Sequence, residues 1–267
     1  MLTAEQIDTF HADGYLLGPK VLTDAQVDEL REELGRVIED EGGSGPQPVQ
    51  IANLAGEEAH PVWQIVNIWG ASKAFRRLCF DPTIVAEIAQ LTDPAELRLW
   101  HDQVQYKPAA VGGVNPWHQD NPYWPTLSCP DQVSAWVALD DVAEDNGCMS
   151  MVRGSHAWGN QIGFLHTFEH YDAMPDEWNG HRLERELRPV PKGHVHYHHA
   201  LTWHGSHANT SGRPRRAIAV HYMTDKTCFV DSGKHLMEQF VTVGAGDKLA
   251  GDHFPLVWAG GQCVPAG

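Results

Sequence analysis

The hydrophobic pattern of the chain changes near residue 97, and this change constrains the fold more than any other feature. From there on the period is two, which is typical of β-strands because successive side chains point to opposite faces of a sheet. Stretches of this kind cover 97–107, 133–139, 194–201 and 216–223, with turns rich in Gly, Pro, Asn and Asp between them. The pattern predicts a closed antiparallel architecture: a sandwich, jelly roll or barrel.

The first part of the chain carries helix signals instead. The Thr-x-x-Gln pattern of a capping box begins at Thr3 and again at Thr23, and each pattern marks the start of a helix. A further helix is expected over about 82–91, where a Pro suits the first turn. We therefore predict one domain over 1–267, with a helical layer over about 1–95, a jelly-roll core over about 96–225 and a C-terminal extension over about 226–267.

Composition excludes several classes of function. The chain has 19 Lys and Arg against 35 Asp and Glu, a net charge of −16, which argues against nucleic acid or an anionic membrane as partner. It has no apolar run long enough to span a bilayer and no secretory signal pattern. Its five cysteines are irregularly spaced, which favours a reducing compartment. We expect a cytoplasmic monomer or homodimer that acts on a small molecule.

Histidine points to metal chemistry. The chain has 17 histidines, and three of them begin a His-x-Asp pattern, but only His118 and Asp120 follow a predicted strand. Residues i and i+2 of a strand share a face, so this imidazole and this carboxylate can bind one ion. Two histidines and one carboxylate form the facial triad of non-haem Fe(II) oxygenases. His204 is the candidate for the third ligand, the alternative being a hydrogen-bonded core histidine.

An arginine supports the choice of His204. Among the 17 histidines, only His204 is followed eleven residues later by an arginine, Arg215, beyond a Gly-Arg-Pro turn. A strand–turn–strand path would bring its guanidinium back beside the metal, where it can bind a carboxylate in bidentate fashion. The alternative is that the arginines of this turn form a solvated cluster.

Several further motifs occur in a fixed order along the chain. They are Phe10-x-x-x-Gly14-Tyr15, Trp117-His118-Gln119-Asp120, Trp136-Val137-Ala138-Leu139-Asp140, Asn146-Gly147-Cys148-Met149, Gly154-Ser155-His156 and His204-Gly205-Ser206. Together, from about residue 5 to 224, they resemble the phytanoyl-CoA dioxygenase family of Fe(II)- and 2-oxoglutarate-dependent oxygenases. The resemblance implies a mainly β fold with flanking helices: a double-stranded β-helix, which is a jelly roll of the cupin kind.

The resemblance also implies roles for individual residues. The expected metal ligands, which are also the catalytic residues, are His118, Asp120 and His204. The expected cofactors are Fe(II), 2-oxoglutarate as cosubstrate, and O2. The residues expected to bind the cosubstrate or line its pocket are Arg215, Ser206, Gln103 and Trp136. Since Asp120 is present, halogenation is disfavoured, because halogenating relatives lack this carboxylate.

The substrate is expected to be polar. The stretches expected to line its cavity, 42–70 and 156–192, mix aromatic and hydrogen-bonding groups and offer no long aliphatic trough. We therefore expect hydroxylation, desaturation or oxidative cyclisation of a polar molecule, such as a sugar-containing natural product in antibiotic biosynthesis. The expected substrate contacts are Asn121, Tyr123, Trp124 and His198. The alternatives are an acyl-CoA or lipid hydroxylase of the same family, a cupin-like metal protein without 2-oxoglutarate chemistry, and a structural jelly-roll module.

Overall fold

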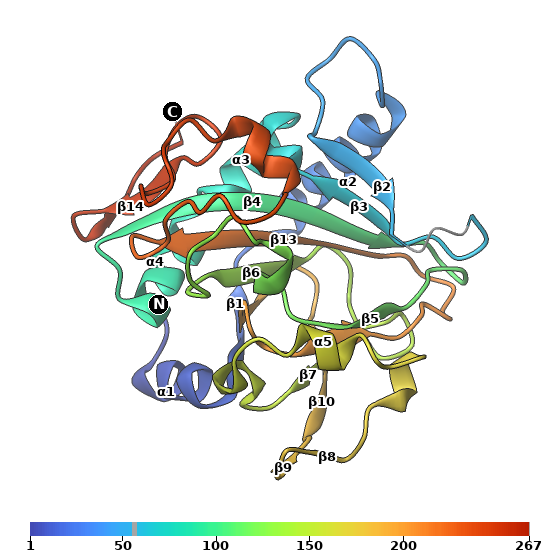
Figure 1. Ribbon diagram of the computed structural model, residues 1–267. Coiled ribbons are helices and arrows are strands. Elements are labelled where there is room, and N and C mark those ends of the chain that lie inside the picture. The colour runs from blue at the N-terminus through green and yellow to red at the C-terminus, as the bar shows by residue number, and fades with distance from the viewer. Residues whose placement is uncertain (55–57, 267) are drawn as a thin grey trace.

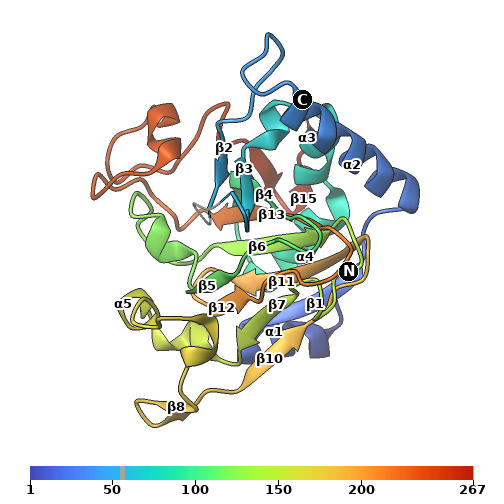
Figure 2. The same cartoon turned by 90° about the vertical axis from the view of Figure 1, so that its right-hand side faces the viewer.

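Two antiparallel sheets face each other in the computed structural model, which describes residues 1–54 and 58–266 (Figures 1 and 2). In the described part, the nine-stranded sheet has the order β1 (Tyr15–Lys20), β11 (His194–His199), β6 (Val133–Ala138), β13 (Arg215–Thr224), β4 (Glu96–Lys107), β14 (Leu256–Ala259), β15 (Gln262–Cys263). The hairpin of β2 (Gln50–Asn53) and β3 (Trp63–Val66) joins it through β4. The four-stranded sheet has the order β10 (Arg185–Arg188), β7 (Met149–Val152), β12 (His204–Ser206), β5 (Asn115–His118).

Helices cover the outer face of the large sheet. They are α1 (Ala4–Asp13), α2 (Asp24–Glu39), α3 (Lys73–Cys79) and α4 (Pro82–Thr92), and the apolar sides of α2, α3 and α4 form one core with that face. Both predicted capping boxes are present, at Thr3 and Thr23, where each Thr hydroxyl accepts a backbone N–H and each Gln returns to the cap. No helix in the described ranges is long and apolar enough to cross a membrane.

Successive side chains of the large sheet point to opposite faces, so they pack in two separate cores. Val133, Ala135 and Val137 of β6 pack in the core under the helices, whereas Trp136 and Ala138 pack against the small sheet. The site described below lies on this second face, between the two sheets. β6 is buried on both of its faces, one under the helices and the other against the small sheet.

The strands predicted over 97–107, 133–139, 194–201 and 216–223 are confirmed as β4, β6, β11 and β13. The segment 156–192 contains only short elements: η3 (Ser155–Trp158), α5 (Ile162–Leu165), η4 (Tyr171–Ala173), β8 (Glu177–Trp178), β9 (His181–Arg182) and β10. Its aromatic side chains, including Trp158 and Trp178, pack around buried Trp203. Aromatic packing therefore holds this segment in place.

Candidate metal centre

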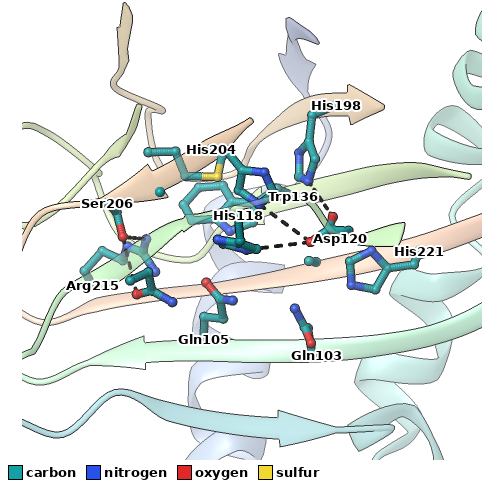
Figure 3. A pocket seen from close by; sticks show the side chains of 14 residues that line it. Gln103, Gln105, His118, Asp120, Trp136, His198, His204, Ser206, Arg215 and His221 are labelled. Carbon is teal, nitrogen blue, oxygen red and sulfur yellow. Dashed lines mark hydrogen bonds and ion pairs between the residues drawn. The ribbon is translucent and has the colours of Figure 1, made fainter. Parts of the chain in front are cut away.

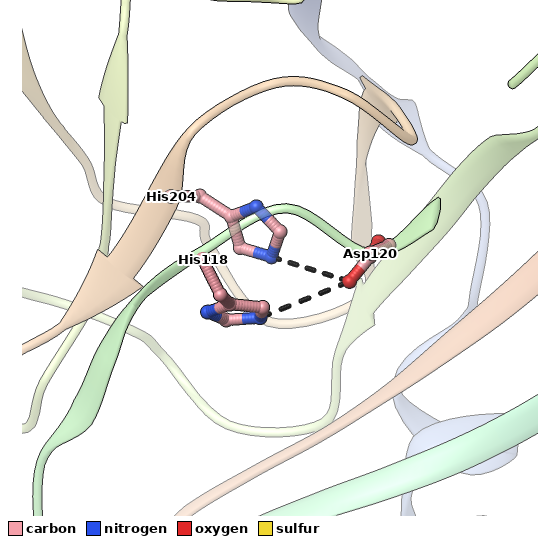
Figure 4. A group of neighbouring side chains, drawn as sticks. All are labelled: His118, Asp120 and His204. Carbon is pink, nitrogen blue, oxygen red and sulfur yellow. Dashed lines mark ion pairs between the residues drawn. The ribbon is translucent and has the colours of Figure 1, made fainter. Parts of the chain in front are cut away.

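Three predicted ligands converge between the ends of β5 and β12 (Figure 4). His118 ends β5, and His204 begins β12 directly opposite it in the antiparallel pairing. The Asp120 Oδ1 atom lies 3.8 Å from His118 Nε2 and 3.6 Å from His204 Nε2. One ion can span these separations if it binds each ligand atom at about 2 Å. Asp120 lies beyond the strand, at the start of η2 (Asn121–Tyr123), so a turn and not the strand pleat brings it to His118.

Backbone carbonyls fix the orientation of both imidazoles. His118 Nδ1 lies 2.8 Å from the Pro116 carbonyl oxygen, and His204 Nδ1 lies 2.9 Å from that of Thr202. Because a carbonyl oxygen only accepts, each Nδ1 carries the proton, and the lone pair of each Nε2 faces Asp120. This is the arrangement by which metal-binding histidines are usually held.

The electrostatics favour the metal-binding protonation states. Burial lowers the pKa of His118, and burial together with His118 lowers that of His204 well below its usual value. Burial alone would raise the pKa of Asp120, but His204 and His198 outweigh it and hold this pKa well below its usual range. At neutral pH the site therefore offers two neutral imidazoles and one carboxylate, which suits a divalent cation.

The second oxygen of Asp120 is held from the large sheet. Asp120 Oδ2 accepts a hydrogen bond from the Ser134 hydroxyl at 3.2 Å and lies 3.1 Å from His198 Nε2. Ser134 in turn lies 2.6 Å from His221 Nδ1. The carboxylate therefore has one oxygen directed at the two ligand imidazoles and one occupied by protein. Sequence reasoning placed His198 at the substrate; in the structure its Nε2 contacts this carboxylate.

A buried guanidinium lies on the other side of the triad (Figure 3). Arg215 donates from Nε to the Gly147 carbonyl oxygen at 3.2 Å and from Nη2 to Ser206 Oγ at 3.5 Å, and it stacks 5.1 Å from the ring centre of Trp136. Its Nη1 has no hydrogen-bond partner, and no carboxylate of the described residues pairs with it. Burial lowers its pKa to about 10, so it stays charged at neutral pH. A buried, unpaired cation of this kind fits a carboxylate ligand such as 2-oxoglutarate.

A cavity of about 350 Å³ opens beside the triad. The side chains that line it are Leu54, Gln64, Val66, His101, Gln103, Gln105, Asn115, Pro116, His118, Asp120, Tyr123, Trp124, His235 and Leu236. Of the described residues, none in this lining is Lys or Arg, and the only carboxylate is the candidate metal ligand Asp120.

Only some of the predicted pocket residues line the large cavity. Gln103 lines both the small space beside Arg215 and the large cavity, and it accepts a hydrogen bond from Gln64 at 2.8 Å. Tyr123 and Trp124 line the large cavity. Asn121 does not, because its amide donates to Gln132 at 3.0 Å. The segment 156–192 contributes nothing to this lining, and the segment 42–70 contributes three residues.

Sequence reasoning missed several residues of the site. His101, from β4, and His235, which precedes η5 (Leu236–Phe240), both line the cavity, with their ring centres 5.5 Å apart. Lys107 lies behind Ser206 and donates to its hydroxyl. His101 lies two residues before Gln103 in the predicted strand, so both should share a face. This was the only sequence signal for any of these three residues. The other two depend on contacts between distant segments.

The comparisons with known proteins agree with this geometry. A non-haem alpha-ketoglutarate-dependent carbocyclase, SnoK, from nogalamycin biosynthesis is 28% identical, with a TM-score of 0.80 over 96% of this chain and 97% of that chain. The epimerase SnoN, solved with Fe3+, alpha-ketoglutarate and nogalamycin RO, is 27% identical, with a TM-score of 0.72 over 94% of this chain and 97% of that chain. Peroxisomal phytanoyl-CoA dioxygenase of Bos taurus is 25% identical over 249 residues, which cover 86% of this chain and 71% of that protein.

These similarities confirm the predicted fold class and the predicted cofactors, iron and 2-oxoglutarate. The double-stranded β-helix is shared across nearly the whole length of the two solved relatives. The model of the family "Phytanoyl-CoA dioxygenase" matches residues 10–217, a range that contains the triad and Arg215. The chain therefore belongs to the phytanoyl-CoA dioxygenase family of iron- and 2-oxoglutarate-dependent oxygenases.

Proposed function

We propose that this dioxygenase oxidises a polar, ring-bearing small molecule, such as a sugar-containing natural product of antibiotic biosynthesis. The observation that carries the proposal is the cavity beside the triad, whose described lining combines aromatic rings, amides and imidazoles with four aliphatic side chains and contains no Lys or Arg. Such walls bind uncharged ring faces and hydroxyl groups well. The likeness of the chain to SnoK and SnoN, both from nogalamycin biosynthesis, supports the same substrate class.

The proposed roles of the residues follow from their positions. His118, Asp120 and His204 hold the iron, while Arg215 and Ser206 bind the distal carboxylate of 2-oxoglutarate. The chemistry that bound iron supplies is the activation of dioxygen, coupled to the conversion of 2-oxoglutarate into succinate and carbon dioxide. The role of the protein is to orient both reactants at the triad.

The test is the stimulation of 2-oxoglutarate turnover by candidate substrates. Iron-loaded protein is incubated with a panel of glycosides and glycosylated aromatic polyketides, and separately with long-chain acyl-CoAs, while succinate is measured. We expect stimulation by polar ring compounds, because the cavity offers no described cation for the phosphates of coenzyme A. Strong stimulation by acyl-CoA alone would instead favour the lipid hydroxylase.

A pair of arginine variants tests the cosubstrate site. Arg215→Ala should abolish succinate formation while metal binding persists, because the triad does not contact this guanidinium. The matched control is Arg213→Ala. Arg213 lies in the turn before β13, is half-exposed, and pairs with Asp145 at 2.7 Å. Unchanged succinate formation in Arg215→Ala would show that the carboxylate site lies elsewhere.

A further inference from the structure

Two imidazoles that do not belong to the triad line the large cavity beside it. His101 lies on β4, two residues before Gln103, so both side chains share the face of the strand that borders the cavity. His235 comes from the segment after β13 and caps the start of η5. The ring centres of the two histidines lie 5.5 Å apart, and their planes differ by 28°. Two distant segments of the chain therefore bring two imidazoles side by side in one cavity.

Hydrogen bonds to the backbone give the two rings opposite tautomers. His101 Nδ1 lies 3.3 Å from the Asp102 carbonyl oxygen, and because a carbonyl oxygen only accepts, this nitrogen carries the proton. His235 Nδ1 accepts the backbone N–H of Met237 at 3.2 Å, so in this ring the proton is on Nε2. His101 therefore offers an acceptor at Nε2, whereas His235 offers a donor at Nε2.

Both imidazoles are neutral at pH 7, so each keeps one donor and one acceptor nitrogen. Burial, with His221 and His235 close by, lowers the pKa of His101 well below its usual value. Burial also lowers the pKa of His235, to about 4. A protonated imidazole has two donors and no acceptor. The low pKa values therefore preserve the difference between the two rings.

The acceptor of His101 has no partner in the described part of the chain. Its Nε2 is buried and makes no hydrogen bond, and the residue is only 2% exposed. Buried polar atoms in proteins nearly always have a hydrogen-bond partner. An unpaired acceptor on a ring that lines a cavity therefore fits a ligand that supplies the missing donor.

Neighbouring aromatic rings hold both imidazoles in place. Trp124 meets His101 edge-on, with the ring centres 5.6 Å apart and the planes at 90°. The ring centre of Trp100 lies 5.1 Å from that of His235, and Trp100 itself stacks on Phe254. This packing restricts the rotation of both imidazoles, so a ligand meets a donor and an acceptor that are already oriented.

We propose that His101 and His235 are a specificity-determining pair that selects a substrate with a free hydroxyl group, which donates to His101 Nε2 and accepts from His235 Nε2. This deepens the proposed function and rests on it, because it takes the large cavity as the substrate site. A hydroxyl group can do both at once, since it has one proton and two lone pairs. An ether or carbonyl oxygen at the same place satisfies His235 and leaves His101 unpaired.

Three probes that differ in hydrogen bonding test the pair. 2-Naphthol donates and accepts, 2-methoxynaphthalene only accepts, and naphthalene does neither. Each probe is titrated into protein loaded with Mn(II) and 2-oxoglutarate, and its fluorescence reports binding. The wild type should bind 2-naphthol about fivefold more tightly than the ether, and the ether about fivefold more tightly than naphthalene, because each step adds one neutral hydrogen bond.

Two variants should each remove a different step of this series. His101→Phe should equalise 2-naphthol and the ether, because the acceptor is gone, and should keep the preference for the ether over naphthalene. His235→Phe should equalise the ether and naphthalene and keep the preference for 2-naphthol. The control is His253→Phe, a half-buried histidine that stacks on Phe240 of η5 and does not line the cavity; both preferences should persist.

The tautomers are measured separately, on the wild type. Nitrogen NMR of Zn(II)-loaded protein, labelled with ¹⁵N at histidine, should show the proton on Nδ1 of His101 and on Nε2 of His235, even if a variant does not fold. The same tautomer in both rings, equal affinities for the three probes, or no binding of any probe would overturn the proposal. Failure of the proposed function has a different signature: turnover stimulated by acyl-CoA alone contradicts it, while ordered probe affinities still support the pair.

Discussion

At the scale of single residues, the histidines differ by which ring nitrogen is engaged. His118 and His204 give Nδ1 to backbone carbonyls and keep Nε2 for the triad, whereas His198 directs Nε2 to the carboxylate of Asp120. Because an ionised carboxylate only accepts, His198 must be protonated at Nε2 and acts as a donor. The residue type alone therefore does not distinguish a histidine that binds the metal from one that orients a metal ligand. The sequence analysis expected His198 at the substrate.

His198→Phe should weaken metal binding. The substitution leaves Asp120 Oδ2 with Ser134 as its remaining partner, so the carboxylate is less firmly oriented. Loss of such a contact behind a metal ligand typically lowers metal affinity by about 10–100-fold. The measurement is competition of Mn(II) against a chelating dye. The control is His196→Phe, on the same strand and equally buried, whose ring nitrogens have no hydrogen-bond partner. Equal losses in both variants would contradict a specific role for His198.

At the scale of elements, alternation predicted the long strands and missed the short ones. β4 has twelve residues and β13 has ten, which is long enough for a period of two to stand out. β12 has three residues, and β5 contains a Pro, so neither has a recognisable pattern. The predicted triad residues nevertheless converge in the structure. His118 and Asp120 were selected because they follow the long predicted strand over 97–107, and His204 because Arg215 follows it eleven residues later. Lys107 was not found, because its pairing with Arg215 depends on the register of two strands more than a hundred residues apart.

The first turn of η1 (Ile68–Gly70) depends on a buried carboxyl of β4. Asp102 accepts from the backbone N–H groups of Ile68 and Trp69, both at 3.0 Å, and burial raises its pKa from 3.8 to about 7. A raised pKa means that the folded state binds the proton more tightly than the unfolded state. The contribution of this proton to stability is therefore complete below pH 3.8 and is lost as the pH rises through about 7.

Asp102→Asn should remove this pH dependence. Between these two pKa values, the free energy of unfolding of the wild type should fall, relative to that of the variant, by about 1.4 kcal/mol for each pH unit. Urea denaturation across this range measures the difference, and subtraction of the variant removes the titration of the other buried groups. Parallel curves for the two proteins would show that Asp102 does not titrate in this range.

At the scale of the whole molecule, apolar side chains hold the sheets and helices together. The apolar residues that join the sheets to each other and to the helices include none of the three triad residues. We therefore expect protein stripped of metal by a chelator to keep its far-ultraviolet circular dichroism. Mn(II) at a hundred times its dissociation constant should then raise the free energy of unfolding by about 2.7 kcal/mol, which thermal or urea unfolding measures. Unfolding on chelation would show that the ion is structural.

The residues that line the large cavity come from two parts of the chain, inside and after the range that the family model matches. The triad and Arg215 lie inside residues 10–217, the range matched by the family model, whereas His235 and Leu236 come from the segment that follows it. That segment is anchored by Met237, a fully buried side chain whose sulfur accepts from Asn67 at 3.3 Å. Mutations that accumulate between the anchor and β13 reshape one side of the cavity and leave the ligands of the ion untouched. Related chains can therefore share one iron centre and differ in the substrate that they oxidise.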